Sequence, residues 1–139
     1  MAQAPLRISF AGGGTDIEPY CSSFGGCTLA AAITKYNRAE YYPEGSVASE
    51  NEIAQAILKH FNIRGNLVIQ SDIPRMSGLG GSAACCVAGI KAIKPELDKL
   101  EIARFAYEIE RNEMGIAGGY QDQLESAFGG LTFIEFGKD

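Results

Sequence analysis

The stretch DIPRMSGLGGSAACC, residues 72–86, constrains the fold more than any other part of this chain. It places three glycines within four positions and follows them with a serine and a row of small apolar residues. Clustered glycine marks backbone that adopts unusual angles or approaches a ligand closely. The segment NLVIQS before it alternates as a strand does, and the segment SAACCVAGIKAI after it predicts a buried helix that ends before Pro95. The sequence thus predicts a strand, a glycine loop (residues 78–81) and a buried helix in succession.

Physical reasoning leaves two interpretations of the glycine loop open. The loop can be a plain turn, or it can bind phosphate, because a helix start offers unpaired N–H groups and a partial positive charge. Ser82 at the helix start can reach a phosphate or its Mg²⁺. The loop does not match a Walker loop, which needs a lysine. Residues 12–14, GGG, do not form a dinucleotide fingerprint either, because the third glycine position holds Ile17.

Several other segments predict strands. LRISFA predicts a strand with Leu6, Ile8 and Phe10 on one face, AEYY predicts a strand ended by Pro43, and LTFIEF predicts a final strand. CTLAAAI fits either a buried strand or a helix of small residues, and its periodicity does not distinguish them.

Helices are predicted over SENEIAQAILKHF, ELDKLEIARFAYEIERNE and YQDQLESAF, the first of them with a capping box formed by Ser49 and Glu52. These helices are too few to cover both faces of a doubly wound sheet. The pattern therefore predicts an α+β fold with two layers, one sheet and one set of helices. The length favours a single domain over residues 1–139.

Charge and composition exclude several classes of function. The formal net charge is −5 and no block of Lys and Arg occurs, so a nucleic-acid surface is not expected. No apolar run is long enough to span a membrane, and MAQAPLRISF does not resemble a secretion signal. The four cysteines and the single histidine form no metal-ligand pattern, which predicts reduced thiols in a cytoplasmic protein.

Two acidic residues are candidates for phosphoryl-transfer chemistry, which needs a metal ligand and a group that positions or deprotonates the attacking hydroxyl. Glu110 lies late in a predicted helix, and Asp122 follows a pair of glycines. Both can converge on the loop at Ser82 if that helix ends there. Other carboxylates, namely Glu108, Glu113 and Glu125, are interpreted as solvated surface residues.

Three segments together resemble the motifs of the GHMP kinase superfamily. PRMSGLGGSAA is similar to its P-x-x-x-G-L-G-S-S-A-A phosphate loop, and APLRISFAGGGTD resembles its opening motif. The GGGTD ending and the stretch AYEIERNEMGIAGGYQDQLESAFGG resemble the branch that contains the D-glycero-D-manno-heptose 7-phosphate kinases. The three motifs occur in the family's order, which makes the resemblance specific.

The resemblance implies an ATP-dependent sugar kinase domain of the ribosomal protein S5 domain 2-like fold, with ATP and Mg²⁺ as cofactors. The acceptor would be a small sugar or sugar phosphate similar to heptose 7-phosphate. Asp122 would orient or deprotonate the sugar hydroxyl, and Arg7 would stabilise charge on the transferring phosphoryl group. Ser82 and Glu110 would hold Mg²⁺. The triphosphate would be lined by Gly78, Leu79, Gly80, Gly81, Ser82 and Ala83, and the sugar would contact Gly13, Gly14, Thr15 and Asp16.

The chain also departs from the family pattern. It ends at FIEFGKD, about where the family's C-terminal domain begins, and the segment between AAITKYNRAEYY and NLVIQS is shorter than in the family. Gly81 replaces the first serine of the phosphate loop. We therefore expect a shortened domain that lacks the C-terminal domain and exposes an apolar face, covered in a homo-oligomer or by a partner chain. Three hypotheses follow: a kinase completed by another chain, a nucleotide- or sugar-binding module without turnover, and a truncated folding unit.

Overall fold

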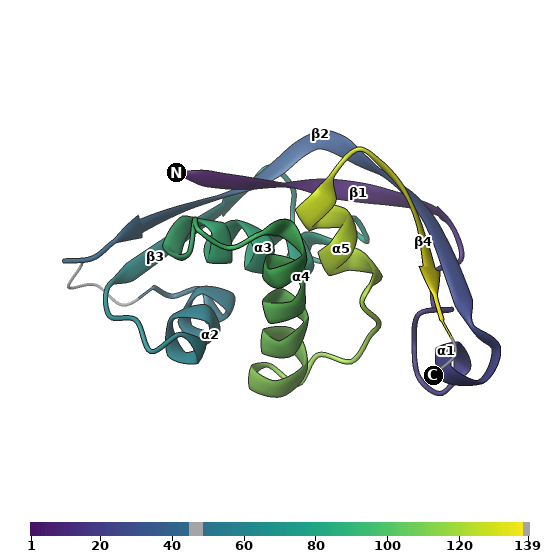
Figure 1. Ribbon diagram of the computed structural model, residues 1–139. Coiled ribbons are helices and arrows are strands. Elements are labelled where there is room, and N and C mark those ends of the chain that lie inside the picture. The colour runs from purple at the N-terminus through teal and green to yellow at the C-terminus, as the bar shows by residue number, and fades with distance from the viewer. Residues whose placement is uncertain (45–48, 138–139) are drawn as a thin grey trace.

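The computed structural model describes residues 1–44 and 49–137. A curved antiparallel sheet arches over a layer formed by the four longer helices (Figure 1). This two-layer α+β architecture confirms the predicted fold class. The strands are β1 (Ala2–Ala11), β2 (Gly26–Tyr42), β3 (Asn66–Ser71) and β4 (Leu131–Phe136), and the helices are α1 (Tyr20–Phe24), α2 (Glu52–His60), α3 (Gly81–Ile93), α4 (Lys99–Glu108), the π-helical turn η1 (Ile109–Glu113) and α5 (Gln121–Phe128).

β2 is the central strand and pairs with all of the others. β1 runs antiparallel along one side of it, while β3 pairs with its C-terminal half and β4 with its N-terminal half on the other side. The segment CTLAAAI is therefore a strand, and it is continuous with AEYY in one strand of 17 residues. The half of the sheet that includes β4 extends beyond the helices, whereas the other half covers them (Figure 1).

The predicted buried helix is α3, which ends before Pro95 and lies at the centre of the core. Its small residues let it approach its neighbours closely. A Cβ atom at Gly89 would lie 2.5 Å from Cδ1 of Ile57 and 3.2 Å from Cδ2 of Leu67. Because no side chain occupies that space, α2 and β3 can both pack directly on α3.

The helices α2 and α4 begin two or three residues later than the sequence pattern predicts. The expected capping box of Ser49 and Glu52 is wrong: Asn51 caps α2, and its side-chain oxygen accepts two backbone hydrogen bonds from the first turn. The Ser49 hydroxyl instead accepts a hydrogen bond from the backbone of Asn51 at 3.2 Å. A complete capping box does occur at α4, formed by Asp98 and Glu101.

The inward-facing side of β1 changes along its length. The register of β1 against β2 shifts between Pro5 and Arg7. Leu6, which lies at the shift, is fully buried, and Arg7 directly after it also faces the helices, where it contacts α5. Leu6, Ile8 and Phe10 were predicted to share one face of the strand, but Leu6 is fully buried whereas Ile8 and Phe10 are 42% and 61% exposed. This irregularity brings a charged side chain to the concave side of the sheet.

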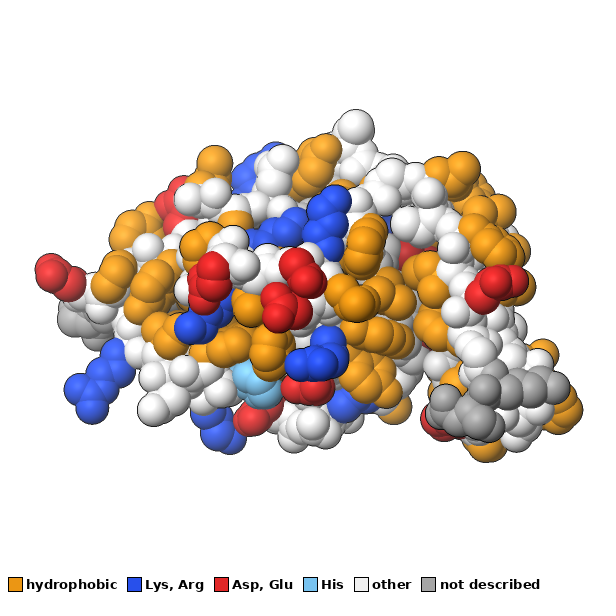
Figure 2. Space-filling view, viewed as in Figure 1, with side chains coloured by type: hydrophobic (Ala, Val, Ile, Leu, Met, Phe, Trp, Pro, Cys, Tyr) orange, Lys and Arg blue, Asp and Glu red, His pale blue; other side chains and the backbone are white. Residues whose placement is uncertain are grey.

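Large apolar side chains remain exposed on the half of the sheet that extends beyond the helices. Leu131 and Phe133 of β4 are 74% and 63% exposed, and Phe24 of α1 is 70% exposed. Hydrophobic side chains are visible over this end of the molecule in Figure 2. Within the described ranges, no helix has the length and apolar character needed to cross a bilayer.

Candidate functional site

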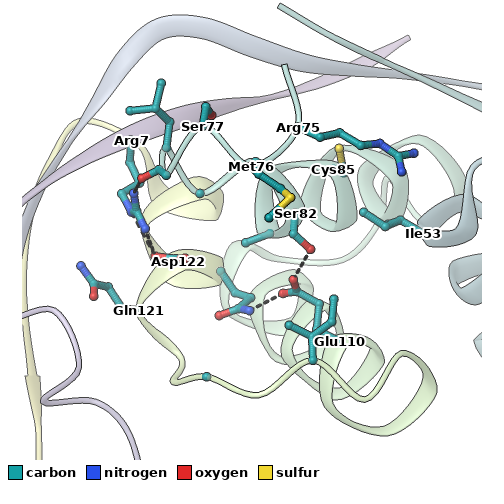
Figure 3. Close-up of a pocket in the computed structure, with 18 of the residues that line it drawn as sticks. Arg7, Ile53, Arg75, Met76, Ser77, Ser82, Cys85, Glu110, Gln121 and Asp122 are labelled. Atoms are coloured by element: carbon teal, nitrogen blue, oxygen red, sulfur yellow. Dashed lines mark hydrogen bonds and ion pairs between the residues drawn. The ribbon is translucent and has the colours of Figure 1, made fainter. Parts of the chain in front are cut away.

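A cleft of about 890 Å³ opens where the glycine loop meets the helices. Ile53, Arg75 and Cys85 lie toward one end of the cleft, and Arg7 and Asp122 lie toward the other (Figure 3). The glycine loop and the start of α3 lie between these ends. The cleft therefore offers a partly apolar compartment and a strongly polar one, joined by backbone N–H groups at a helix start.

The glycine loop is held from both sides. Gly78 and Gly80 adopt φ angles of +75° and +71°, a region that favours glycine, and a Cβ at Gly80 would lie 3.3 Å from Cγ of Arg7. From β2, the buried side chain of Asn37 donates a hydrogen bond to the carbonyl of Gly81 at 2.8 Å. The first N–H groups of α3 have no acceptor within their own helix, so they are available to an anion in the cleft.

Ser82 and Glu110 lie together beneath the loop. The Ser82 hydroxyl donates to Oε1 of Glu110 at 2.5 Å, and Nε2 of Gln123 donates to Oε2 of the same carboxylate. Glu110 is only 3% exposed. It belongs to η1, a π-helical turn, and such turns are frequent at functional sites because they alter the direction of the side chains. The structure thus joins two residues that are 28 positions apart in the chain.

The donor set of Ser82 and Glu110 fits Mg²⁺. Both offer hard oxygen ligands, and Mg²⁺ is commonly held by one or two carboxylates together with substrate phosphates and water. Across residues 1–44 and 49–137, no group of three or more His, Cys, Asp or Glu side chains could hold a metal by itself. Ser82 and Glu110 therefore fit an ion that phosphates at the glycine loop also coordinate.

Arg7 links both walls of the polar compartment. Its Nη2 lies 2.6 Å from Oδ1 of Asp122, its Nε lies 3.1 Å from Oε2 of Glu125, and its Nη1 donates to the carbonyl of Gly78 at 2.8 Å. The side chains of Arg7, Asp122 and Glu125 are 12%, 37% and 2% exposed, respectively. One guanidinium group therefore serves two carboxylates and the glycine loop.

Glu125 is not a solvated surface residue, and that prediction is wrong. It points from α5 into the protein, where burial raises the pKa of its carboxyl to about 7, against the opposing effects of a hydrogen bond from Gln121 and the charge of Arg7. A signal for it was present in the sequence, because Glu125 follows Gln121 by four positions and Asp122 by three, which places all three near one face of a helix.

The loop after β1 provides a third carboxylate. Asp16 accepts a hydrogen bond from the backbone N–H of Gln121 at 3.1 Å, and a Cβ at Gly119 would lie only 1.8 Å from its Oδ2. Of the four residues expected to contact a sugar, Gly13, Gly14 and Asp16 line the cleft. Thr15 does not, because its hydroxyl is hydrogen bonded to the carbonyl of Gly12 at 2.7 Å and fastens the loop to β2. All of the residues expected around the triphosphate do line the cleft.

Cys85 lines the cleft without the properties of a nucleophile. Burial raises the pKa of its thiol to about 11, and burial also raises the pKa of the neighbouring Cys86 thiol well above its ordinary value. Because the thiolate is the reactive form, both side chains remain unreactive thiols at neutral pH. The chemistry of the cleft therefore depends on its carboxylates, Arg7 and the helix start.

The sequence from residue 46 to residue 130 matches the family model described as the GHMP kinases N terminal domain. This match covers more than half of the chain, and the glycine loop, Ser82 and Glu110 all lie inside it. The chain belongs to the GHMP kinase family.

Relatives with named activities support this assignment. The chain is 36% identical to the D-glycero-alpha-D-manno-heptose 7-phosphate kinase of Campylobacter jejuni over 168 aligned residues, covering 96% of the chain and 50% of that kinase. Its structure is similar to that of a D-glycero-D-manno-heptose 1-phosphate kinase from Bacteroides thetaiotaomicron, with a TM-score of 0.79 and 29% identity over 99% of the chain and 56% of the kinase. It also shares the fold of the L. major mevalonate kinase, at a TM-score of 0.69, 18% identity and coverage of 95% of the chain and 47% of that kinase. The chain thus spans about half the length of these proteins.

Proposed function

We propose that residues 1–139 form the N-terminal domain of a sugar kinase, which transfers a phosphoryl group from ATP to a hydroxyl group of a sugar or sugar phosphate. One observation carries the proposal: a single cleft contains a free helix start, the Ser82–Glu110 pair and the Arg7–Asp122 pair. Phosphoryl transfer asks the protein mainly for positioning and charge stabilisation, and these groups supply both.

The two ends of the cleft suggest how the substrates would lie. The apolar compartment near Ile53 suits a nucleotide base, and the glycine loop suits the phosphates. Ser82 and Glu110 would hold Mg²⁺, which neutralises charge on the phosphates when it is bound. We expect the Ser82 hydroxyl to exchange its present hydrogen bond to Glu110 for a contact with the ion.

Asp122 and Asp16 lie at the acceptor end of the cleft. Asp122 is 37% exposed, so it can accept a hydrogen bond from an incoming hydroxyl while Arg7 keeps the carboxylate oriented. Asp16 would bind a second hydroxyl. The named activities of the relatives favour a heptose phosphate as the acceptor.

A binding module without turnover is the alternative, and one substitution separates it from a kinase. Calorimetric titration of the chain with ATP, with and without Mg²⁺, should show binding that depends on the ion. Asp122→Asn should then retain ATP binding but abolish ADP release in the presence of a panel of sugar phosphates. Glu108→Gln is the matched control, because it makes the same change from carboxylate to amide on a side chain outside the cleft. Failure to bind ATP at millimolar concentration would contradict the proposal, and equal low ADP release by the wild type and Asp122→Asn would favour the binding module.

The exposed apolar side chains of β4 and α1 support a further part of this proposal. Leu131, Phe133 and Phe24 are large apolar side chains that are each more than half exposed, and exposed apolar side chains that gather in a patch mark a site of contact with another polypeptide. We propose that another polypeptide segment covers these side chains.

A further inference from the structure

Glu125 is a buried carboxylate to which the proposed transfer reaction assigns no task. One of its oxygens accepts a hydrogen bond from Nε2 of Gln121 at 2.8 Å. The other lies 3.1 Å from Nε of Arg7 and accepts no hydrogen bond from the residues that the structure describes. A buried negative charge must be compensated or else neutralised by a proton. For Glu125, the compensation comes from Arg7.

Arg7 is also the residue through which a ligand can influence Glu125. Its Nη1 is bonded to the carbonyl of Gly78, in the loop where we place the phosphates, and its backbone N–H donates to the next carbonyl of that loop, Leu79, at 3.1 Å. Guanidinium groups bind phosphate oxygens strongly and often through two hydrogen bonds. A polyphosphate at the loop would therefore compete with Glu125 for Arg7.

The charges around Glu125 determine how its protonation would respond if Arg7 moved away. Arg7 faces it from β1, Asp122 lies one turn earlier on α5, and Asp16 faces it from the loop after β1. In the described part of the chain, no charged group of α3, α4, β2 or β4 adds to these. Two carboxylates, those of Asp122 and Glu125, thus share one guanidinium group. Asp122 and Asp16 both raise the pKa of Glu125, while Arg7 lowers it.

We propose that Glu125 is a positioning residue for Arg7, and that it takes up a proton from solvent when a polyphosphate at the glycine loop draws Arg7 away. In this step an O–H bond forms at Oε2 of Glu125, and the carboxylate becomes a neutral acid. In the free protein the ionised carboxylate holds the guanidinium group toward Asp122. The inference rests on the proposed function, because it requires phosphates to bind at the loop.

The coupling predicts proton uptake on binding. A carboxyl group with a pKa of about 7 is roughly three-quarters ionised at pH 7.5, so up to that fraction of a proton can be taken up per ligand. The probe is ATP with Mg²⁺, titrated calorimetrically at pH 7.5 in two buffers of different ionisation enthalpy. We expect the wild type and the control Glu108→Gln to take up equal fractions of a proton, and both to take up more than Glu125→Gln does. Equal proton numbers in all three proteins would overturn the inference.

A measurement without ligand keeps the inference distinct from the proposed function. The titration of the Glu125 carboxyl carbon can be followed by NMR, with its signal assigned by its absence from Glu125→Gln. Replacing Arg7 by Gln imitates the withdrawal of the guanidinium group and should shift the midpoint upward by about one pH unit or more. An unchanged midpoint would refute the role of Arg7, even if ATP binds. A raised midpoint without ATP binding would refute the proposed function but would leave Arg7 as the partner that keeps Glu125 ionised.

Discussion

Replacement of Glu125 by Gln should change how the stability of the protein depends on pH. The carboxyl pKa rises from 4.5 to about 7 on folding, chiefly because the side chain is buried. Each pKa unit corresponds to about 1.4 kcal/mol, so ionisation of Glu125 costs the folded state roughly 3 kcal/mol. Glutamine keeps the shape of the side chain and can still bond to its neighbours, but it cannot ionise.

The sign of the effect follows from proton binding. Because the folded pKa lies above the unfolded value, the folded state binds more protons between about pH 4.5 and 7. The contribution of Glu125 to stability is therefore fully present below pH 4.5 and is lost as the pH rises through 7. Glu125→Gln lacks this loss. Its free energy of unfolding should therefore increase relative to that of the wild type by about 3 kcal/mol between pH 4.5 and pH 8.

Urea unfolding followed by circular dichroism across this pH range measures the difference directly. Groups that titrate equally in both proteins cancel in the comparison. Glu108→Gln is the control, since Glu108 is a partly exposed helix residue whose Oε1 lies 3.7 Å from Nε of Arg104. Parallel stability profiles for Glu125→Gln and the wild type would refute the reasoning, because they would mean that Glu125 titrates as it does in the unfolded chain.

Three further substitutions test other parts of the structure. Gly89→Val should lower the free energy of unfolding by about 1–3 kcal/mol, measured by urea unfolding, because even its Cβ would lie 2.5 Å from Ile57. Gly119→Ala should weaken acceptor binding by about tenfold or more while ATP binding, measured by calorimetry, stays unchanged, because the new Cβ would displace Asp16. Phe133→Glu should reduce the mass measured by light scattering at high protein concentration, because it places charge on the apolar surface of β4; an unchanged mass would contradict an interface there.

Local patterns were sufficient to predict most of the secondary structure. The segments NLVIQS and LTFIEF are strands over the same residues as predicted, and YQDQLESAF contains α5. In each segment the spacing of the apolar residues matches the type of element that forms. CTLAAAI stayed ambiguous because a segment that is small and apolar throughout has no polar face from which to read a period. The pairing of β2 with strands on both sides decides that it is a strand.

The site residues likewise include some that the sequence identified and others that only the structure shows. Ser82, Glu110, Asp122 and Arg7 were identified from motifs, and the structure places them in one cleft. Glu125 was missed, since a carboxylate is normally solvated and its burial depends on β1, which lies more than 100 residues earlier in the chain. The inward position of Arg7 depends likewise on a register shift between β1 and β2, which strict alternation does not predict.

The sequence alone determined most of the element types, the glycine loop at the start of α3 and the family to which those motifs belong, because these properties depend on residues close together in the chain. Only the tertiary structure decided which side chains share the cleft and in what state of charge. Burial, ion pairing and strand register arise between distant segments. For Arg7 and Glu125, the environment that sets their behaviour therefore exists only after β1 and α5 have packed together.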